Sequence, residues 1–217
     1  IQRSGEPEPK EISITREAIT VQSVTTAYLD DGVAQITLSY FGPNTARDFQ
    51  SAANEIVVKG SRGILLDMRN NPGGYLDAAV SVASQFVQNG TTIVIEEAAD
   101  GTKTTQRAQN GETLLGIPTV VLIDQGSASG SEIVAGALQD LHVATLVGAK
   151  TFGKGSVQTI IPLTDGSGLR LTTAKYFTPK GRSIHGKGIT PDIIVEPPKV
   201  VAAAADPATP VAPPPSP

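Results

Sequence analysis

Hydrophobic and polar positions alternate along two stretches near the beginning of the chain, over residues 12–24 and 32–41. A period of two is typical of a β-strand with one buried face. Over residues 44–60 apolar side chains instead recur every three or four positions, as on one face of a helix. Asn44 is the predicted N-cap of this helix and Gly60 its predicted end. Its inward face is predicted to consist of Ala46, Phe49, Ala53, Ile56 and Val57.

Shorter, almost uninterrupted apolar runs follow, and such runs are typical of strands covered on both faces. They span residues 63–69, 91–97 and 117–124. An Asp-Gly pair at 100–101 predicts a hairpin turn. Further strands are predicted in the segments 143–150, 156–163, 169–178 and 190–196.

Two more helices complete the predicted order of elements. One spans residues 75–88, and the other follows the serine-rich start of "DQGSASGSEIVAGALQD", residues 124–140. Strands that feed helices through glycine-rich turns indicate an α/β fold with buried strands, packed helices and one core domain, residues 17–196.

Both ends of the chain differ from this core in composition. Residues 1–16 are polar and irregular, and residues 197–217 are rich in proline and alanine, which predicts a flexible tail. The chain opens at Ile1 without a signal peptide, and we interpret it as a processed piece. The missing signal therefore leaves its compartment open.

Composition narrows the classes of function. A net charge of -4, with only four tyrosines, five phenylalanines and no tryptophan, argues against nucleic acid as a partner. The absence of cysteine excludes disulfides, a thiol nucleophile and thiolate metal sites. His142 and His185 are far apart in the sequence, so we predict no histidine-built metal site and no cofactor. No apolar run approaches the roughly 18 residues of a membrane span.

The segment "GAKTFGKGS", residues 148–156, nearly matches a phosphate-binding P-loop. Gly155 follows Lys154, however, so the hydroxyl arrives one place late, and the next residues predict a strand where a P-loop requires a helix. We therefore do not predict nucleotide binding. Lys154 is then either an ordinary surface lysine or, in a dry site, a base that is neutral near physiological pH.

Three serines, Ser127, Ser129 and Ser131, lie at the start of the third predicted helix. A helix N-terminus favours negative charge, so a serine there is suited to acyl transfer, with backbone N–H groups stabilising the oxyanion. The other interpretation is a simple N-cap. The spacing is not that of a nucleophile elbow, and the residues alone leave both interpretations open.

A third candidate is "DMRNNPGG", residues 67–74, which ends in a glycine pair after a predicted buried strand. Free N–H groups at the carboxyl end of such a strand are a common place for ligands in α/β sheets. The other interpretation is an ordinary turn into the next helix.

Taken together and in this order, these segments resemble the carboxyl-terminal processing proteases, or tail-specific proteases, which are serine peptidases with a Ser–Lys dyad. The resemblance covers residues 12–196, including "LRLTTAKYFTPKGRSIHGKGITPDIIVE" at its end. It implies a core like the crotonase and caseinolytic-protease folds. It also implies a serine endopeptidase that cleaves proteins near their carboxyl terminus through an acyl-enzyme.

The resemblance assigns roles to individual residues. Ser129 is the nucleophile, Lys154 the general base, and Gln158 orients the lysine. The oxyanion hole is formed by the N–H of Gly130 and by that of Gly73 or Gly74, between which the sequence does not choose. The mechanism needs a neutral Lys154, so its site is expected to be buried and free of carboxylates.

The sequence departs from the family where a PDZ domain usually precedes the core. Residues 1–16 resemble only the exit of such a domain, so the alternative is a latent or non-catalytic peptide-binding core. Gly130 stands in place of the usual alanine, and His185 in place of a frequent glutamine. The resemblance further implies protein or peptide substrates with accessible carboxyl termini, a homo-oligomer, an adaptor or lipoprotein partner, and a periplasmic or other extracytoplasmic location.

Overall fold

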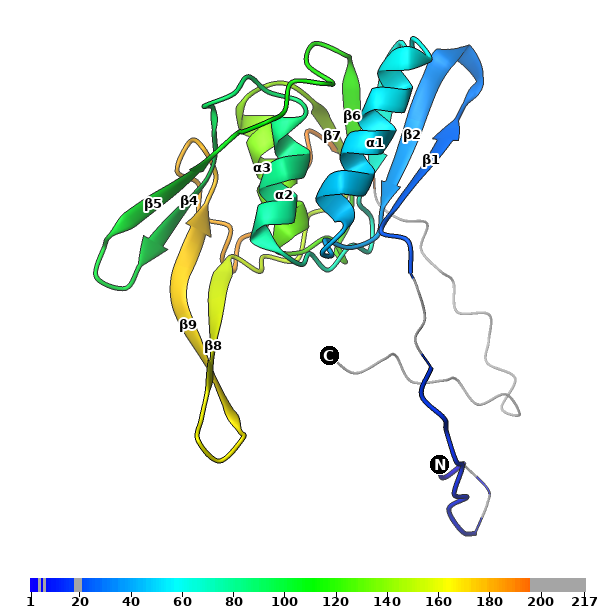
Figure 1. The fold of residues 1–217 in the computed structure, drawn as a ribbon, viewed down its shortest axis with the longest axis vertical. Coiled ribbons are helices and arrows are strands. Elements are labelled where there is room, and N and C mark those ends of the chain that lie inside the picture. The colour runs from blue at the N-terminus through cyan, green and yellow to red at the C-terminus, as the bar shows by residue number, and fades with distance from the viewer. Residues whose placement is uncertain (4, 6, 18–20, 196–217) are drawn as a thin grey trace. The chain divides into compact units, whose positions relative to one another are not determined.

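The computed structural model describes residues 1–3, 5, 7–17 and 21–195. The chain divides into two units, residues 1–21 with 197–217 and residues 22–196, and the second contains every helix and strand of the described residues. Figure 1 shows the second unit as a sheet covered by helices, with a smaller sheet beside it. None of the helices in the described part has the length and apolar character needed to cross a membrane.

The central sheet has six strands in the order β1-β2-β3-β6-β7-β10. β1 and β2 pair antiparallel, and all the other neighbours are parallel. The bounds are β1 Val24–Tyr28, β2 Val33–Leu38, β3 Gly63–Asp67, β6 Thr119–Ile123, β7 Thr145–Gly148 and β10 Ile193–Ile194. A short 3-10 helix, Asp30–Gly32, connects β1 to β2.

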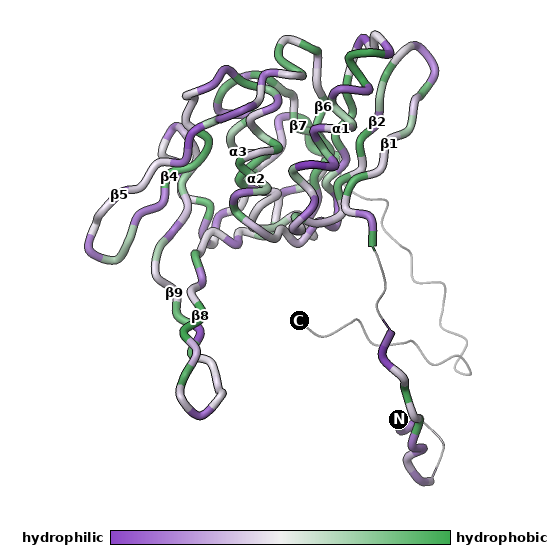
Figure 2. Tube along the Cα trace, viewed as in Figure 1, coloured by the Kyte–Doolittle hydropathy of each residue, from purple (hydrophilic) through white to green (hydrophobic). Residues whose placement is uncertain are grey.

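Three helices lie next to one another on one face of this sheet (Figure 1). They are α1 (Thr45–Val58), α2 (Leu76–Ser84) and α3 (Gly130–Asp140). Figure 2 shows that hydrophobic positions gather in the central strands and along these helices. Alternate strand residues such as Ile36, Leu66 and Val121 are fully or almost fully buried, so the core lies between this face and the helices.

The second sheet has four antiparallel strands in the order β5-β4-β9-β8. The bounds are β4 Thr92–Ala98, β5 Lys103–Arg107, β8 Ser156–Pro162 and β9 Gly168–Phe177. In Figure 1 the β8–β9 hairpin extends away from the helices. Most of its side chains are exposed, so this hairpin is held by its backbone ladder more than by a core.

The order of strands and helices predicted from residue 32 onward is confirmed, as is the α/β class, and three details are wrong. The predicted strand over residues 12–24 begins only at Val24, and residues 18–20 lie outside the described part. Ile14 is 80% exposed, so the alternation there has no sheet to be buried against. Residues 196–217, with the predicted tail, are also outside the described part, and the PDZ remnant stays a prediction.

The two other differences concern burial. Val57 is 47% exposed, because α1 turns Ala52 rather than Val57 toward the core. The central strands are not covered on both faces, since β3 and β6 alternate buried and half-buried residues. Their second face is only partly covered, which an apolar run alone does not reveal.

Candidate active site

The candidate site lies where β3 and β6 end and α3 begins. After β6, Asp124 organises the turn, because its Oδ1 accepts hydrogen bonds from the main-chain N–H groups of Asn70, Gly126 and Ser127. A Cβ at Gly126 would come within 2.8 Å of Asn70 Cα. The turn after β3 and the turn after β6 are therefore so close that only glycine fits at position 126. The carboxyl ends of these neighbouring parallel strands therefore bring "NNPGG" and the serine cluster together.

The three serines of the cluster have different surroundings. Ser127 Oγ donates to Met68 O at 2.8 Å, and Ser131 Oγ donates to Asn71 O at 2.9 Å. Both side chains are fully buried. Ser129 is only half-buried, and its hydroxyl, unlike those of Ser127 and Ser131, donates no hydrogen bond to any other described residue. Ser129 is thus the serine whose oxygen is available for chemistry.

Ser129 occupies the N-cap of α3 with an unusual backbone, φ 53° and ψ -111°. A non-glycine residue in this region is strained and requires surrounding structure to hold it. The Glu132 carboxylate supplies one half of a capping box by accepting the Ser129 N–H at 2.9 Å. The Glu132 N–H, in turn, bonds the Ser129 carbonyl at 2.9 Å and also faces the Ser129 hydroxyl oxygen, which completes the capping box. Ser129 is therefore at the cap position predicted by the simpler interpretation, and its hydroxyl oxygen takes part in the cap as an acceptor.

Glu132 is a fully buried carboxylate that connects the two candidate catalytic segments. Its Oε2 accepts the main-chain N–H groups of Ser129 at 2.9 Å and of Lys154 at 2.8 Å. Its Oε1 accepts the Thr151 hydroxyl at 2.5 Å and the Gly153 N–H at 2.7 Å. Four donors satisfy the buried charge without a cation, aided by the N-terminus of α3. The backbones of Ser129 and Lys154 are consequently held against one oxygen atom.

The Lys154 side chain differs from the expected buried base, because it is exposed in the structure. Its backbone is fixed on both sides: a Cβ at Gly155 would lie 2.2 Å from His185 N, and one at Gly153 would lie 3.1 Å from Gly188 N. Glu132 lies at the lysine's own N–H, and the expectation of a side-chain amine free of carboxylates stays a prediction. These contacts involve only the main chain, so they fix the segment and leave the Lys154 side chain free to turn.

Gln158 lies on β8 and is exposed. Its Nε2 donates to Thr172 Oγ1 on β9 at 2.6 Å, and no hydrogen bond joins it to Lys154 in the described structure. Its assigned role in orienting the lysine stays a prediction.

The glycine turn is held in place by Asn71, which is fully buried. Its Nδ2 donates to Leu38 O at 2.7 Å, and its Oδ1 accepts the Gly73 N–H at 2.9 Å. The Gly73 N–H is therefore already used. Within the described residues, the N–H groups of Gly74 and Gly130 have no acceptor, and they are the two donors available for an oxyanion.

Two neighbouring charges in this turn neutralise each other. Arg69 Nη2 lies 2.6 Å from Asp67 Oδ2 and forms a salt bridge with it. Burial raises the pKa of the Asp67 carboxyl, but hydrogen bonds and the charge of Arg69 outweigh burial and leave the pKa below its ordinary value. Arg69 is thus paired with Asp67.

We expect Gly73→Ala to reduce cleavage by at least about tenfold and to lower stability by about 1–3 kcal/mol. Gly73 has φ +94°, and an added Cβ would lie 2.6 Å from Ser129 Cβ and 2.7 Å from Gly130 N. Proteolytic rate and thermal unfolding measure the two effects. Gly90→Ala is the matched control, because Gly90 has φ +83° but open space around the added carbon. Equal losses of activity in both variants would show that the Ser129 contact has no part in the effect.

The sequence interpretation missed Glu132, Asn71 and Thr151. The spacing S-x-x-E of Ser129 and Glu132 is the pattern of a capping box and was a usable signal for Glu132. Its bonds to residues 151–154 depend on the tertiary fold, as do the bonds of Asn71 to Leu38 and Gly73. No local pattern predicts those contacts.

Comparisons with known proteins identify the family of the chain. A profile of peptidase family S41 matches residues 32–195. A carboxyl-terminal-processing protease of Synechocystis sp. is 44% identical over 202 residues, which cover 91% of this chain and 47% of the relative. A carboxy-terminal-processing protease of Bartonella bacilliformis is 45% identical over 203 residues, covering 91% of this chain and 46% of the relative.

Solved structures show the same likeness. The photosystem II D1 C-terminal processing protease superposes with a TM-score of 0.76 at 35% identity, covering 84% of this chain and 50% of that one. A putative S41 protease of Bacteroides fragilis, at 19% identity and a TM-score of 0.68, shares the fold. The chain spans about half the length of these relatives. The profile match and the identity to processing proteases show that the chain belongs to peptidase family S41.

Proposed function

We propose that this chain is the catalytic core of a serine endopeptidase that cleaves proteins near their carboxyl terminus. The observation that supports this most strongly is the state of Ser129. Its hydroxyl alone in the cluster donates no hydrogen bond among the described residues, the N–H groups of Gly130 and Gly74 are unused, and its backbone is bonded to the same carboxylate as that of Lys154.

In the proposed acylation step, neutral Lys154 Nζ takes the proton from Ser129 Oγ as this oxygen bonds to the substrate carbonyl carbon. The carbonyl oxygen becomes an oxyanion that accepts hydrogen bonds from the N–H groups of Gly74 and Gly130. The carbon–nitrogen bond then breaks, and Lys154 gives the proton to the leaving amine. The product is an ester between Ser129 and the amino-terminal part of the substrate.

Deacylation repeats these transfers with water. Lys154 Nζ takes a proton from the water as its oxygen bonds to the ester carbon, and the same two N–H groups stabilise the oxyanion. When the bond from that carbon to Ser129 Oγ breaks, Lys154 returns the proton to Oγ. The free enzyme and a new carboxyl terminus result.

The lysine side chain must turn toward Ser129 for this chemistry. Catalytic hydrogen bonds are often formed fully only in the substrate complex. We propose that the substrate covers Lys154, excludes water from it and favours its neutral form. Glu132 accepts the Lys154 N–H and so holds the backbone from which the side chain turns.

The partners and location are proposals on the same basis. We propose that substrates are proteins or peptides that are unfolded or have an accessible carboxyl terminus, and that the enzyme acts outside the cytoplasm. We propose further that it forms a homo-oligomer and has an adaptor or lipoprotein partner. The assigned periplasmic or extracytoplasmic location rests on the resemblance to the family.

Cleavage of unfolded casein is expected to accelerate as the pH rises from 5 to 9, because a general-base lysine works only when neutral. Initial rates at fixed enzyme concentration measure this dependence. A rate that stays flat over this range contradicts the mechanism.

The pH range of this assay ends at 9 because the stability of the fold is expected to fall at higher pH, owing to Tyr176. Burial, and next the nearby charge of Glu96, raise the pKa of Tyr176 to about 12. An unfolded tyrosine ionises near pH 10, so the unfolded state loses its proton first and stability falls as the pH rises above about 10. Circular dichroism at each pH is the control that separates loss of fold from loss of rate.

A further inference from the structure

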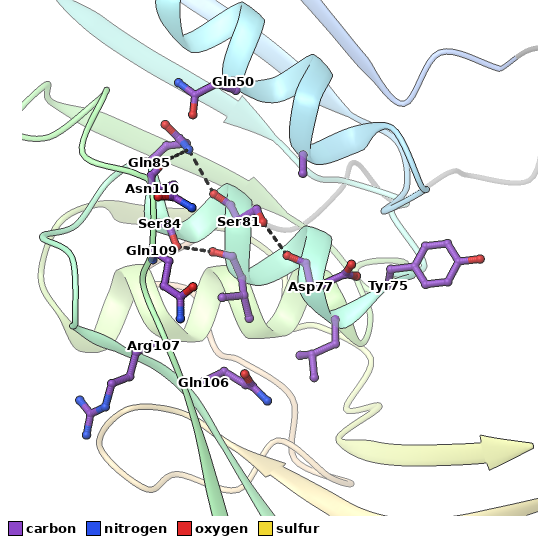
Figure 3. A pocket seen from close by; sticks show the side chains of 13 residues that line it. Gln50, Tyr75, Asp77, Ser81, Ser84, Gln85, Gln106, Arg107, Gln109 and Asn110 are labelled. Atoms are coloured by element: carbon purple, nitrogen blue, oxygen red, sulfur yellow. Dashed lines mark hydrogen bonds between the residues drawn. The ribbon is translucent and has the colours of Figure 1, made fainter.

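A pocket of about 660 Å³ lies along α2, between α1 and the segment that follows β5 (Figure 3). Its size is in the usual range for binding sites. It begins at Tyr75, directly after the glycine pair of the candidate oxyanion hole, and reaches Gln85 at the end of α2. The nine residues of α2 span about 13–14 Å, which is the length of about four residues of extended chain.

The pocket is lined by side-chain amides rather than by ionised groups of one sign. Gln50, Gln85, Gln106, Gln109 and Asn110 all contribute, and Val80 and Leu76 supply apolar surface between them. Figure 3 shows Gln85 between Gln50 of α1 and Asn110 of the following loop. The side-chain amides of Gln109 and Asn110 make no hydrogen bond to the rest of the described chain. Each amide offers both a donor and an acceptor, as does each peptide unit of a polypeptide.

Gln85 carries the strongest indication of a missing ligand. Its side chain is 4% exposed, and its Oε1 is the one buried side-chain polar atom in the described residues that lacks a hydrogen-bond partner. Its Nε2 faces two carbonyl oxygens, Ser81 O at 3.4 Å and Asn110 O at 3.5 Å. If the oxygen and nitrogen of the Gln85 amide were exchanged, the oxygen would face two carbonyl oxygens and no hydrogen bond could form. The two carbonyls therefore fix the nitrogen on their side and leave Oε1 as the atom without a partner. A buried acceptor without a donor is costly, and such atoms call for a specific explanation.

We propose that this pocket binds an extended segment of the polypeptide substrate, and that the buried Gln85 amide turns toward that segment so that its Oε1 accepts a main-chain N–H. The proposal rests on the proposed peptidase function and adds a binding region to it. The side-chain amides of Gln109 and Asn110 pair with the peptide backbone, since those of Gln50 and Gln106 already donate within the chain, while the small apolar surface takes side chains of moderate size. Binding is therefore expected to depend little on substrate sequence, and it places the segment beside the glycine turn that precedes Tyr75.

The test uses binding to the 217-residue chain carrying Ser129→Ala, so that no cleavage occurs. Two fluorescein-labelled ten-residue peptides of alternating alanine and serine are compared by fluorescence anisotropy. One has an ordinary backbone, and the other is N-methylated at alternate residues, which removes half of its backbone donors. Both peptides are titrated against the Ser129→Ala chain with and without Gln85→Leu.

Gln85→Leu is expected to weaken binding of the ordinary peptide by about two- to tenfold, the range of one net hydrogen bond. For the N-methylated peptide, the factor by which Gln85→Leu weakens binding is expected to be less than half as large. Its methyl groups already remove N–H donors that bond Gln85 Oε1, so removing the acceptor as well costs little more. Equal factors for both peptides, or no effect on either, overturn the proposal.

Two further variants control this comparison. Gln88→Leu makes the same change at an exposed position outside the pocket, and it is expected to leave both affinities unchanged. Gln109→Leu alters an exposed pocket amide and is expected to weaken the ordinary peptide as well, which keeps the test decisive if Gln85→Leu does not fold. Unchanged binding in Gln109→Leu then overturns the proposal.

A competition assay tests whether the pocket is occupied by substrate or by another segment of a longer polypeptide. The ordinary peptide is expected to raise the apparent KM for casein in the wild-type chain, with less effect in Gln85→Leu. Binding without competition overturns the assignment to substrate. If the wild-type chain cleaves no protein, the proposed function fails, and the anisotropy cycle still decides whether the pocket binds peptide.

Discussion

Ser129→Ala is expected to reduce cleavage of unfolded casein by at least about 1,000-fold, and Lys154→Ala is expected to do the same. The first variant removes the oxygen that forms the acyl-enzyme, and the second removes the base that activates this oxygen. Because the two residues act in one step, the double variant is expected to be no less active than either single variant. Initial rates of casein cleavage, together with thermal unfolding, measure these effects.

Two neighbouring residues provide matched controls. Ser131→Ala removes a buried hydroxyl that bonds Asn71 O, so it is expected to lower stability while cleavage continues. Lys150→Ala removes an exposed lysine from the same loop and is expected to leave the rate unchanged. Substantial activity in Lys154→Ala would show that the lysine is not the base, and activity in Ser129→Ala would exclude this serine as nucleophile.

Glu132→Gln is expected to have the second largest effect, with a loss of activity of about 100-fold and a loss of stability of several kcal/mol. The carboxylate accepts four hydrogen bonds with two oxygens. A glutamine replaces one of these oxygens by an NH2 group, which is a donor and faces two other donors. The two hydrogen bonds to that oxygen, either the Oε1 or the Oε2 pair, are therefore lost. The strained Ser129 backbone and the Lys154 segment lose their common support.

A purely structural role for Glu132 predicts a different set of results. If Glu132 only stabilises the fold, then the folded fraction of Glu132→Gln retains its kcat at low temperature. If Glu132 positions the dyad, kcat falls while KM changes little, and Glu132→Asp, which keeps the carboxylate, recovers part of the rate. Glu55→Gln serves as control, because Glu55 is an exposed residue of α1 with one surface ion pair. An unchanged kcat in folded Glu132→Gln would contradict the positioning role.

Periodicity predicted the elements of the core well, because local sequence and burial agree there. α1 begins after Asn44 as predicted, and the apolar run from Gly63 forms β3. The alternation before Val24 was misleading for a physical reason: a period of two marks a strand only where a neighbouring strand and a core face exist. Likewise, an apolar run does not tell whether the second face of a sheet is covered.

The candidate site was predictable only in part. The helix start at Ser129 supports either a cap or a nucleophile, and the structure shows the cap, so the nucleophile stays a prediction. Between Gly73 and Gly74 the sequence does not choose; the bond from the Gly73 N–H to Asn71 Oδ1 favours Gly74 and depends on the tertiary fold. Gln158 illustrates the opposite case, since its role was assigned by resemblance and its amide bonds Thr172 in the structure.

The most direct test of the central claim is to identify the atom that reacts with a serine-directed electrophile. The wild-type chain is treated with a peptidyl fluorophosphonate, digested, and analysed by mass spectrometry, with the rate of adduct formation followed in parallel for Lys154→Ala. We predict a single adduct on Ser129 Oγ that forms at least about 100-fold more slowly without the lysine. An adduct on another residue, or equal rates in the two proteins, would contradict a Ser129 nucleophile activated by Lys154.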